Sequence, residues 1–494
     1  MNTPNKSNFN QALWLSISYI CSMAVGIVSS AILSRYFNKT EYGTYKQIMY
    51  VYHILFTVFQ AGLPAVFTYF LPRYSKGEGK YIVKKINSLL FGLGVLCSAV
   101  LFASSGLLAN ILKNPELATG LKIFAFFPLF TLPTLGVEGI YTVNKNTRFV
   151  AFYNITTRLL MLICIIFPVL FIKNDYRYAL VGWGIASFLA FIIAMIAKNR
   201  VYSGEEEVTI PNMYRDVFNY TIPIMGSALV FMVFNSASQF FISRYYGTDA
   251  FAEYSNGYMT LPFAAIFITP IRMLLTPMFA KASADGNYET ALKTLYSSIK
   301  QIFVLLIPLI IFSFVYAREI MQFLYGDEYI NSYIYFRIIL MFNLVEMFTF
   351  SSVLNAIGKS KQHFYFDISC TIILWSIDAV LVMSGIGNPY LITAVFTLIN
   401  ATCRYFLPGI YLYRIIHLNV LTKDILSYMI KIMFHTGIAA FAIYQIIRIT
   451  NILQNPLFVI CISLALYYLL LIATSRLVKV NYLQALLKFR KKTL

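Results

Sequence analysis

Seven ionisable side chains lie inside long apolar stretches of the sequence rather than in the polar segments between them. They are Glu138, Arg158, Arg272, Glu346, Asp367, Asp378 and Arg404. A charged group inside a membrane costs at least about 2.5 kcal/mol, so it normally faces a partner or water. Guanidinium groups offer a planar fork of donors to phosphate oxygens, and carboxylates can take up a cation or a proton. These residues are therefore the candidates for chemistry.

The three arginines are the candidate substrate-binding residues. Arg158, Arg272 and Arg404 each lie about eight to ten residues from the predicted cytoplasmic end of their apolar stretch, so we expect them at a common depth. Three guanidinium groups around one space would suit a phosphate or pyrophosphate. The alternative is structural: each arginine pairs with an acid or extends its charged head to the inner membrane surface.

The four acids are candidates for ion coupling or for lining a polar cavity. Glu346 follows Asn343 by three positions, and Asp378 follows Asp367 by eleven, so each pair shares a helix face. Glu138 completes the set. Packing contacts inside a helical bundle would explain the same residues without a coupling role.

Other kinds of site find little support in the sequence. The six cysteines fall in apolar stretches without close pairs, and the four histidines, His53, His363, His417 and His435, are scattered. The chain carries no P-loop motif, so we do not expect ATP as the direct energy source. We expect no catalytic residues and no metal site, and no cofactor apart from an unidentified coupling cation or proton. The protein is not expected to be an enzyme.

Hydropathy fixes the elements that must position these residues. The sequence is 59% hydrophobic and 12% charged, against about 25% charged in soluble proteins. Its apolar stretches have the length of helices that cross a bilayer. We predict an all-α integral membrane protein with about 14 transmembrane helices, at 11–34, 48–71, 86–112, 119–142, 149–172, 178–197, 217–242, 255–279, 295–316, 334–357, 363–384, 389–413, 425–447 and 456–475.

An internal repeat groups these helices. Phe9-Asn10 returns as Phe218-Asn219, and the Ser-Arg-Tyr segment at Arg35 returns at Arg244, both 209 positions later. Such self-similarity indicates a duplicated chain. We predict an N-terminal six-helix lobe (1–200), a pseudo-symmetric C-terminal six-helix lobe (201–415), two additional transmembrane helices (416–476) and a basic cytoplasmic tail (477–494). Because each repeat holds an even number of helices, both lobes enter the membrane from the same side.

The distribution of positive charge predicts the orientation. With the N-terminus inside, the inner segments hold roughly 24 Lys and Arg and the outer loops roughly 11. Lys198, in the segment after the sixth predicted helix, counts among the inner ones. Both termini are therefore expected in the cytoplasm. The net charge of +19 lies beside predicted helices, so we expect membrane lipids and no nucleic acid as partners.

One loop carries a resemblance to a known family. The segment RYFNKTEYGTY, from Arg35 to Tyr45, closely resembles the R-x-L-G-x-x-E-Y-G-x-Y loop after the first helix of Wzx-type bacterial polysaccharide flippases. These proteins belong to the multidrug/oligosaccharidyl-lipid/polysaccharide exporter superfamily. Phe37-Asn38 replaces the usual Leu-Gly. Arg35, Tyr42, Gly43 and Tyr45 are carried over as markers of the fold, because the glycine permits a turn and no transport role follows.

A second match supports the first. The turn at Gly358-Lys359 is similar to a G-K turn after the tenth helix of that family, and the helix plan of six, six and two also fits. The resemblance implies two lobes around a cationic cavity, in which the arginines would hold the pyrophosphate of an undecaprenyl-pyrophosphate-linked oligosaccharide. Transport would follow alternating access across the bacterial inner membrane and would feed O-antigen (lipopolysaccharide), capsule or exopolysaccharide assembly. Glycosyltransferases and a glycan polymerase are implied neighbours.

Two alternatives remain open. A cation-coupled drug antiporter of the same superfamily would suit an acidic cavity and twelve helices, whereas buried arginines and 14 helices favour the flippase. A membrane polymerase or ligase for polysaccharides would need a large extracytoplasmic loop, which the sequence lacks. Because the internal duplication can enclose a pathway within one chain, we expect a monomer. The glycan and the coupling ion are not encoded in a readable motif.

Overall fold

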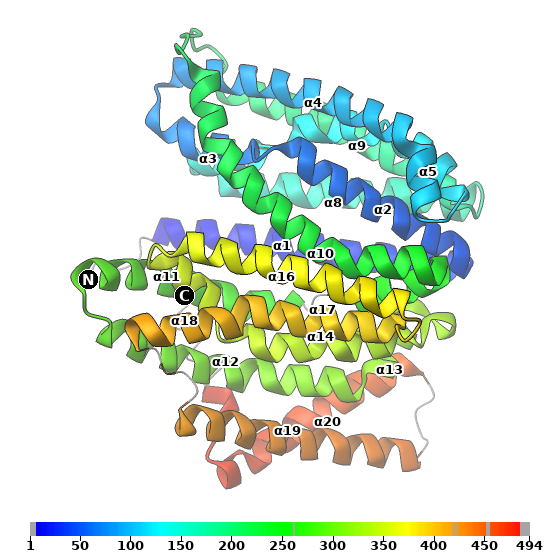
Figure 1. The fold of residues 1–494 in the computed structure, drawn as a ribbon, viewed down its shortest axis with the longest axis vertical. Helices are drawn as coiled ribbons and strands as arrows, with labels where there is room; N and C mark the ends of the chain where they lie inside the picture. Colours follow the sequence, from blue (N-terminus) through cyan, green and yellow to red (C-terminus); the bar gives the residue numbers. More distant parts are fainter. Residues whose placement is uncertain (1–5, 260–261, 418, 420–421, 451–454, 485–494) are drawn as a thin grey trace. The chain divides into compact units, whose positions relative to one another are not determined.

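Helices are the only regular elements among residues 6–259, 262–417, 419, 422–450 and 455–484, which the computed structural model describes. Figure 1 shows them as long helices packed side by side within each part of the chain. The first half contains α1 (Lys6–Tyr36), α2 (Lys39–Gln60), α3 (Pro64–Phe70), η1 (Leu71–Arg73), α4 (Lys76–Ile111), α5 (Glu116–Phe124), α6 (Phe127–Thr131), η2 (Leu132–Thr134), α7 (Val137–Val143), α8 (Thr147–Phe171) and α9 (Tyr176–Val201).

A long helix leads into the second half. This is α10 (Met213–Gly257), which is interrupted at Gly247 with a φ of 83°. It is followed by α11 (Pro262–Asp285), α12 (Glu289–Val315), α13 (Ala317–Tyr325), η3 (Asp327–Tyr329), α14 (Ser332–Glu346), α15 (Phe350–Ala356), α16 (Ser360–Met383), α17 (Pro389–Ala401), η4 (Thr402–Phe406), α18 (Leu407–Ile416), α19 (Lys423–Thr450) and α20 (Pro456–Val478).

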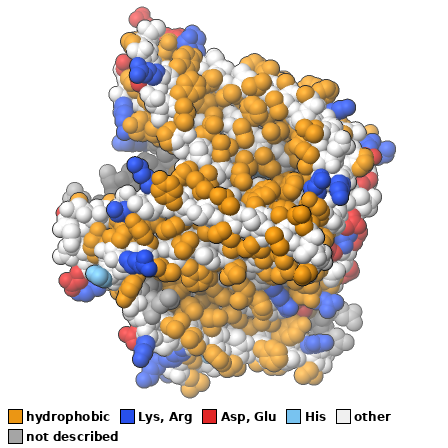
Figure 2. Space-filling view, viewed as in Figure 1, with side chains coloured by type: hydrophobic (Ala, Val, Ile, Leu, Met, Phe, Trp, Pro, Cys, Tyr) orange, Lys and Arg blue, Asp and Glu red, His pale blue; other side chains and the backbone are white. Residues whose placement is uncertain are grey.

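The helical class predicted from hydropathy is confirmed. Within the described residues, 12 helical segments are long and apolar enough to cross a membrane, or 13 if α14 and α15, bent by 42° at their junction, form one span. The remaining predicted span, 255–279, corresponds largely to α11, which is not in that set. Figure 2 shows hydrophobic side chains over the middles of the helices, with Lys and Arg mostly toward their ends. This is the surface of a multi-pass membrane protein.

The chain divides into two compact units, Met1–Ala252 and Glu253–Leu494. The division falls inside α10, a few residues after its interruption at Gly247. The lobe boundaries predicted from the repeat, at 200/201 and 415/416, remain predictions. Most of the predicted basic tail, residues 485–494, lies outside the described residues.

The segment from Arg35 to Tyr45, after α1, caps the start of α2 and packs this helix against its neighbours. Asn38 is the N-cap: its Oδ1 accepts from the Glu41 amide at 2.9 Å, and the Glu41 carboxylate accepts in return from the Asn38 amide. This reciprocal pair satisfies two free amides of the first turn. Gly43 lies against α10, where an added Cβ would sit 2.2 Å from the Thr248 carbonyl oxygen. Glu41 and Gly43 therefore serve the fold.

Repeat-equivalent positions meet in the same region. The Thr40 hydroxyl donates to Asp249 Oδ1 at 2.9 Å, and the two residues are 209 positions apart, the offset of the sequence repeat. Both belong to the first unit. Contact between equivalent residues is what a local two-fold relation between repeated segments produces.

Candidate functional site

Two helices of the second unit bring a guanidinium and a carboxylate together. Arg272 on α11 approaches Glu346, the last residue of α14, with Nη2 and Oε1 3.3 Å apart. Their side chains are 35% and 25% exposed. The other Glu346 oxygen accepts from Asn343 Nδ2 at 3.2 Å, so the Asn343 and Glu346 side chains share one helix face. Arg272 Nε is buried and has no hydrogen-bond partner.

A second arginine, Arg404, lies in a widened stretch of helix. Arg404 lies in η4, a short π-helical segment between α17 and α18, and such segments often mark functional sites. Its Nε donates to Asn400 Oδ1 at 2.9 Å, and its carbonyl accepts from the Ser351 hydroxyl. The adjacent Tyr405 hydroxyl lies within electrostatic reach of Arg272, Glu346 and Arg404. We name Arg272, Asn343, Glu346, Arg404 and Tyr405 the charged cluster of the second unit.

The two aspartates of α16 have different surroundings. Asp367 Oδ1 accepts from the Cys403 thiol at 3.1 Å, and His363 lies within electrostatic reach of both Asp367 and Arg404. Asp378 is fully buried, and neither of its carboxylate oxygens has a hydrogen-bond partner. A buried carboxylate without partners is costly, and a bound proton or cation would offset that cost. No group of three or more His, Cys, Asp or Glu in the described chain could hold a metal ion.

The first unit holds the other two predicted site residues. Arg158 on α8 is exposed, and its Nη1 lies 3.8 Å from Met161 Sδ. Tyr52, His53 and Tyr153 lie within reach of its charge. Glu138 on α7 accepts a hydrogen bond from the Tyr19 hydroxyl of α1. The structure thus groups two of the three candidate arginines, Arg272 and Arg404, and places Arg158 in the other unit.

The sixth predicted helix extends beyond its predicted end at residue 197, because α9 continues to Val201 and includes Lys198. Lys198 is fully buried in the last turns of α9. Its Nζ donates to Asn87 Oδ1 at 2.7 Å, to the Pro133 carbonyl at 2.8 Å and to the Leu135 carbonyl. These carbonyls lie where the fourth span breaks into α6, η2 and α7, and a proline-containing break leaves carbonyls without helical donors. The signal in the sequence was the pair of prolines in that span, because the carbonyls that a proline break leaves without helical donors need a donor from elsewhere in the protein.

Sequence comparison identifies the family. The model of the polysaccharide biosynthesis protein family matches residues 9–283, which is more than half of the chain. A second family model, MatE, matches residues 223–380. No curated protein sequence matches the chain significantly.

Solved structures show the same fold. The lipid II flippase MurJ in an inward closed conformation matches with a TM-score of 0.68 and 14% identity, covering 94% of this chain and 99% of that one. An inward-facing multidrug resistance MATE family transporter of the MOP superfamily matches with a TM-score of 0.62 and 12% identity, covering 83% of this chain and 95% of that one. A MOP superfamily transporter from Pyrococcus furiosus matches with a TM-score of 0.58 and 12% identity, covering 85% of this chain and 99% of that one.

At 12–14% identity, these three structures show a shared fold. They agree with a chain of at least 12 apolar helices that carries its charged cluster inside helices. The chain belongs to the polysaccharide biosynthesis protein family.

Proposed function

We propose that this protein is a flippase that moves an undecaprenyl-pyrophosphate-linked oligosaccharide across the bacterial inner membrane. The charged cluster of the second unit carries the proposal. Arg272 is partly exposed although it lies in a helix of a membrane protein, and only one of its nitrogens is engaged by Glu346. The guanidinium, which also interacts with the Tyr405 hydroxyl, has the planar arrangement of donors that suits pyrophosphate oxygens. MurJ, whose fold this chain shares, is itself described as a lipid II flippase.

Glu346 gives the cluster a way to hold and release its cargo. In the absence of cargo its carboxylate neutralises and orients the Arg272 guanidinium, so the charge is not left unpaired in the membrane. An arriving pyrophosphate competes with this carboxylate for the guanidinium, and Arg404 and the Tyr405 hydroxyl add a further cation and a further donor within electrostatic reach. The carboxylate then replaces the cargo as it leaves. Alternating access of the two lobes would carry the head group across.

Asp378 is the proposed coupling group. Its two buried and unpaired oxygens can take up a proton or a cation, and occupancy would offset the cost of burying the charge. The source of energy would then be an ion gradient. The other aspartate of α16, Asp367, is engaged by Cys403, so it is the weaker candidate.

The proposal extends to the wider setting of the protein. The protein would work as a monomer in the inner membrane with both termini in the cytoplasm, next to glycosyltransferases and a glycan polymerase. Its product would enter O-antigen, capsule or exopolysaccharide synthesis. The family description itself names polysaccharide biosynthesis.

A complementation experiment tests the proposal. In a host that lacks its own flippase, the wild-type chain should restore surface glycan from a matching donor, and Arg272→Ala and Arg404→Ala should lower it at least about tenfold because the phosphate loses charged hydrogen bonds. Arg414→Ala is the matched control, since Arg414 is exposed near the end of α18. Membrane abundance is measured for each variant. Equal activity of all four proteins would refute the assigned role of the cluster.

The MatE match favours a second candidate, a drug antiporter. Fluorescent dye efflux in the same cells separates the two functions. Efflux that depends on Asp378, without restored glycan for any donor, would replace the flippase by the antiporter.

A further inference from the structure

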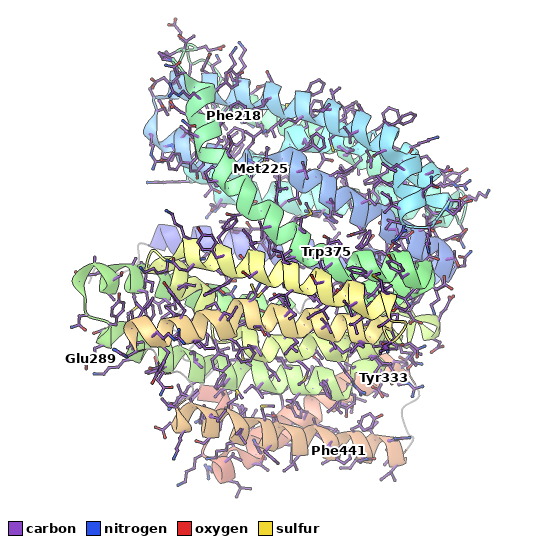
Figure 3. All side chains as sticks on the ribbon, viewed as in Figure 1. Phe218, Met225, Glu289, Tyr333, Trp375 and Phe441 are labelled. Carbon is purple, nitrogen blue, oxygen red and sulfur yellow. The ribbon has the colours of Figure 1, made fainter. Side chains whose placement is uncertain are left out.

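A pocket of about 360 Å³ lies in the second unit, outside the charged cluster. It is lined by the junction of α12 and α13, by the end of α19 and by the beginning of α20. Figure 1 shows α13 packed against α20, and the ends of α12 and α19 lie on the same side of this unit. Figure 3 agrees, because Tyr333 and Phe441 lie toward that end and Glu289, which begins α12, lies at the opposite one.

The rim of the pocket is cationic. Arg318 and Arg448 both line it, and both are exposed. A third arginine nearby is already engaged: Arg337 Nε donates to the Phe314 carbonyl at 2.9 Å and its Nη2 to the Val315 carbonyl at 3.4 Å. Arg337 thus caps the end of α12. The guanidinium groups of Arg318 and Arg448 remain for an anion.

The interior of the pocket holds buried polar groups whose hydrogen bonds are incomplete. Glu319 Oε2 and the Tyr316 hydroxyl are buried without a hydrogen bond of normal geometry. Burial raises the pKa of the Glu319 carboxyl above its ordinary value. No ion pair within the described residues joins Glu319 to either rim arginine. Tyr444 interacts with the Glu319 carboxyl and Ser463 with the Tyr316 hydroxyl. Buried polar groups normally have well-formed partners, so the Glu319 carboxylate has capacity for a further donor.

Aromatic rings complete the interior. Tyr316 and Tyr444 both line the pocket, and their ring centroids are 5.4 Å apart at an interplanar angle of 79°. Tyrosine faces beside a carboxylate form a site for an ammonium group. The pocket therefore presents an anion-binding rim and a cation-binding interior, at a volume within the range of about 300–1,000 Å³ that holds small ligands.

We propose that this pocket binds a phosphoethanolamine group, with the phosphate between Arg318 and Arg448 and the ammonium against Glu319 and the two tyrosines. The group is the head of a membrane lipid. Three membrane-crossing segments end around the pocket, at Val315, Thr450 and Pro456, and helix ends lie at the depth of lipid head groups. In the orientation predicted from charge, this is the extracytoplasmic leaflet. The bound lipid would join α20 to α13 without taking part in cargo binding.

Lipid retention by the full-length protein in nanodiscs tests this inference, with native mass spectrometry as the readout. We expect phosphatidylethanolamine to be retained about tenfold more than phosphatidylcholine or phosphatidylglycerol, because neither of these offers Glu319 an N–H donor. Glu319→Gln should remove the preference. The matched control is Glu328→Gln, because Glu328 is exposed in η3 and does not line the pocket.

Two further arms keep the outcomes distinct. Arg448→Gln should weaken retention of every phospholipid, and thermal unfolding in detergent checks that each variant is folded. Equal retention of the three lipids by the wild-type protein would overturn the inference. Free phosphoethanolamine is the probe for a soluble ligand: if it displaces the lipid at millimolar concentration, the pocket serves a soluble zwitterion and the lipid assignment fails.

Discussion

Two glycines of α9 offer a sharp test of how the first unit is packed. An added Cβ at Gly182 would lie 2.0 Å from the Cys164 carbonyl oxygen, 2.7 Å from its carbon and 3.0 Å from Ile165 Cα. All three atoms are backbone atoms of α8, so no side-chain rotation can relieve the overlap. At Gly184, two residues later, an added Cβ would meet nothing within 4 Å. Gly182→Ala and Gly184→Ala therefore make the same chemical change with opposite steric consequences.

The magnitude follows from two terms. Alanine is favoured over glycine in a helix by about 0.5–1 kcal/mol, and this gain applies to both variants. Overpacking costs about 1–3 kcal/mol, and it applies only at position 182, where α8 and α9 must separate. The difference between the variants isolates the overpacking term, because the propensity term cancels. We expect Gly184→Ala to be neutral or slightly stabilising and Gly182→Ala to be destabilising.

Thermal unfolding of the purified protein in detergent measures the difference. For a unit of this size, about 1 kcal/mol corresponds to about 2–4 °C in Tm, so the Tm of Gly182→Ala should lie at least about 2 °C below that of Gly184→Ala. Both variants should still reach the membrane. Equal Tm values, or a lower value for Gly184→Ala, would show that α8 and α9 do not approach as described.

Two other substitutions probe buried polar groups. Lys198→Met leaves three oxygen acceptors without a donor, at a cost of about 1–3 kcal/mol each, and part of this cost is recovered because an ammonium group is no longer buried. We therefore expect a lower Tm, whereas Arg200→Met, at an exposed position in the same turn, should leave the Tm unchanged. Equal effects of the two substitutions would contradict the role of Lys198 as donor to these three oxygens. Burial raises the pKa of Glu319 above 4.5, although Arg318, Arg337 and Tyr444 act in the opposite direction. The folded state therefore binds this proton more tightly than the unfolded state does. Wild-type stability should therefore fall as pH rises from about 4.5 through the raised pKa. In lipid-free detergent, Glu319→Gln should weaken this dependence of Tm on pH and should give a higher Tm than the wild type at neutral pH. Parallel curves of Tm against pH for the two proteins would refute the assignment.

The charged side chains inside helices were found from the sequence, but their partners were not. Arg272 and Glu346 are 74 positions apart, and their ion pair depends on how α11 packs against the end of α14. For Arg272, the structure shows the contact expected from the structural alternative, in which an arginine pairs with an acid. Arg158 has no such pair among the described residues. One pattern in the sequence therefore covers two different environments.

Hydropathy alone determined that the chain is helical and crosses the membrane repeatedly, because in lipid each helix must satisfy its own backbone. The loop from Arg35 to Tyr45 pointed to the family because a helix cap such as the Asn38–Glu41 pair depends on a few neighbouring residues. Tertiary structure decided the rest. The burial of Lys198, the unpaired carboxylate of Asp378 and the pocket at Glu319 all arise where helices distant in sequence turn particular faces toward one another. Helical periodicity shows which residues share one face of a helix, and only tertiary packing decides which residues of other helices contact that face.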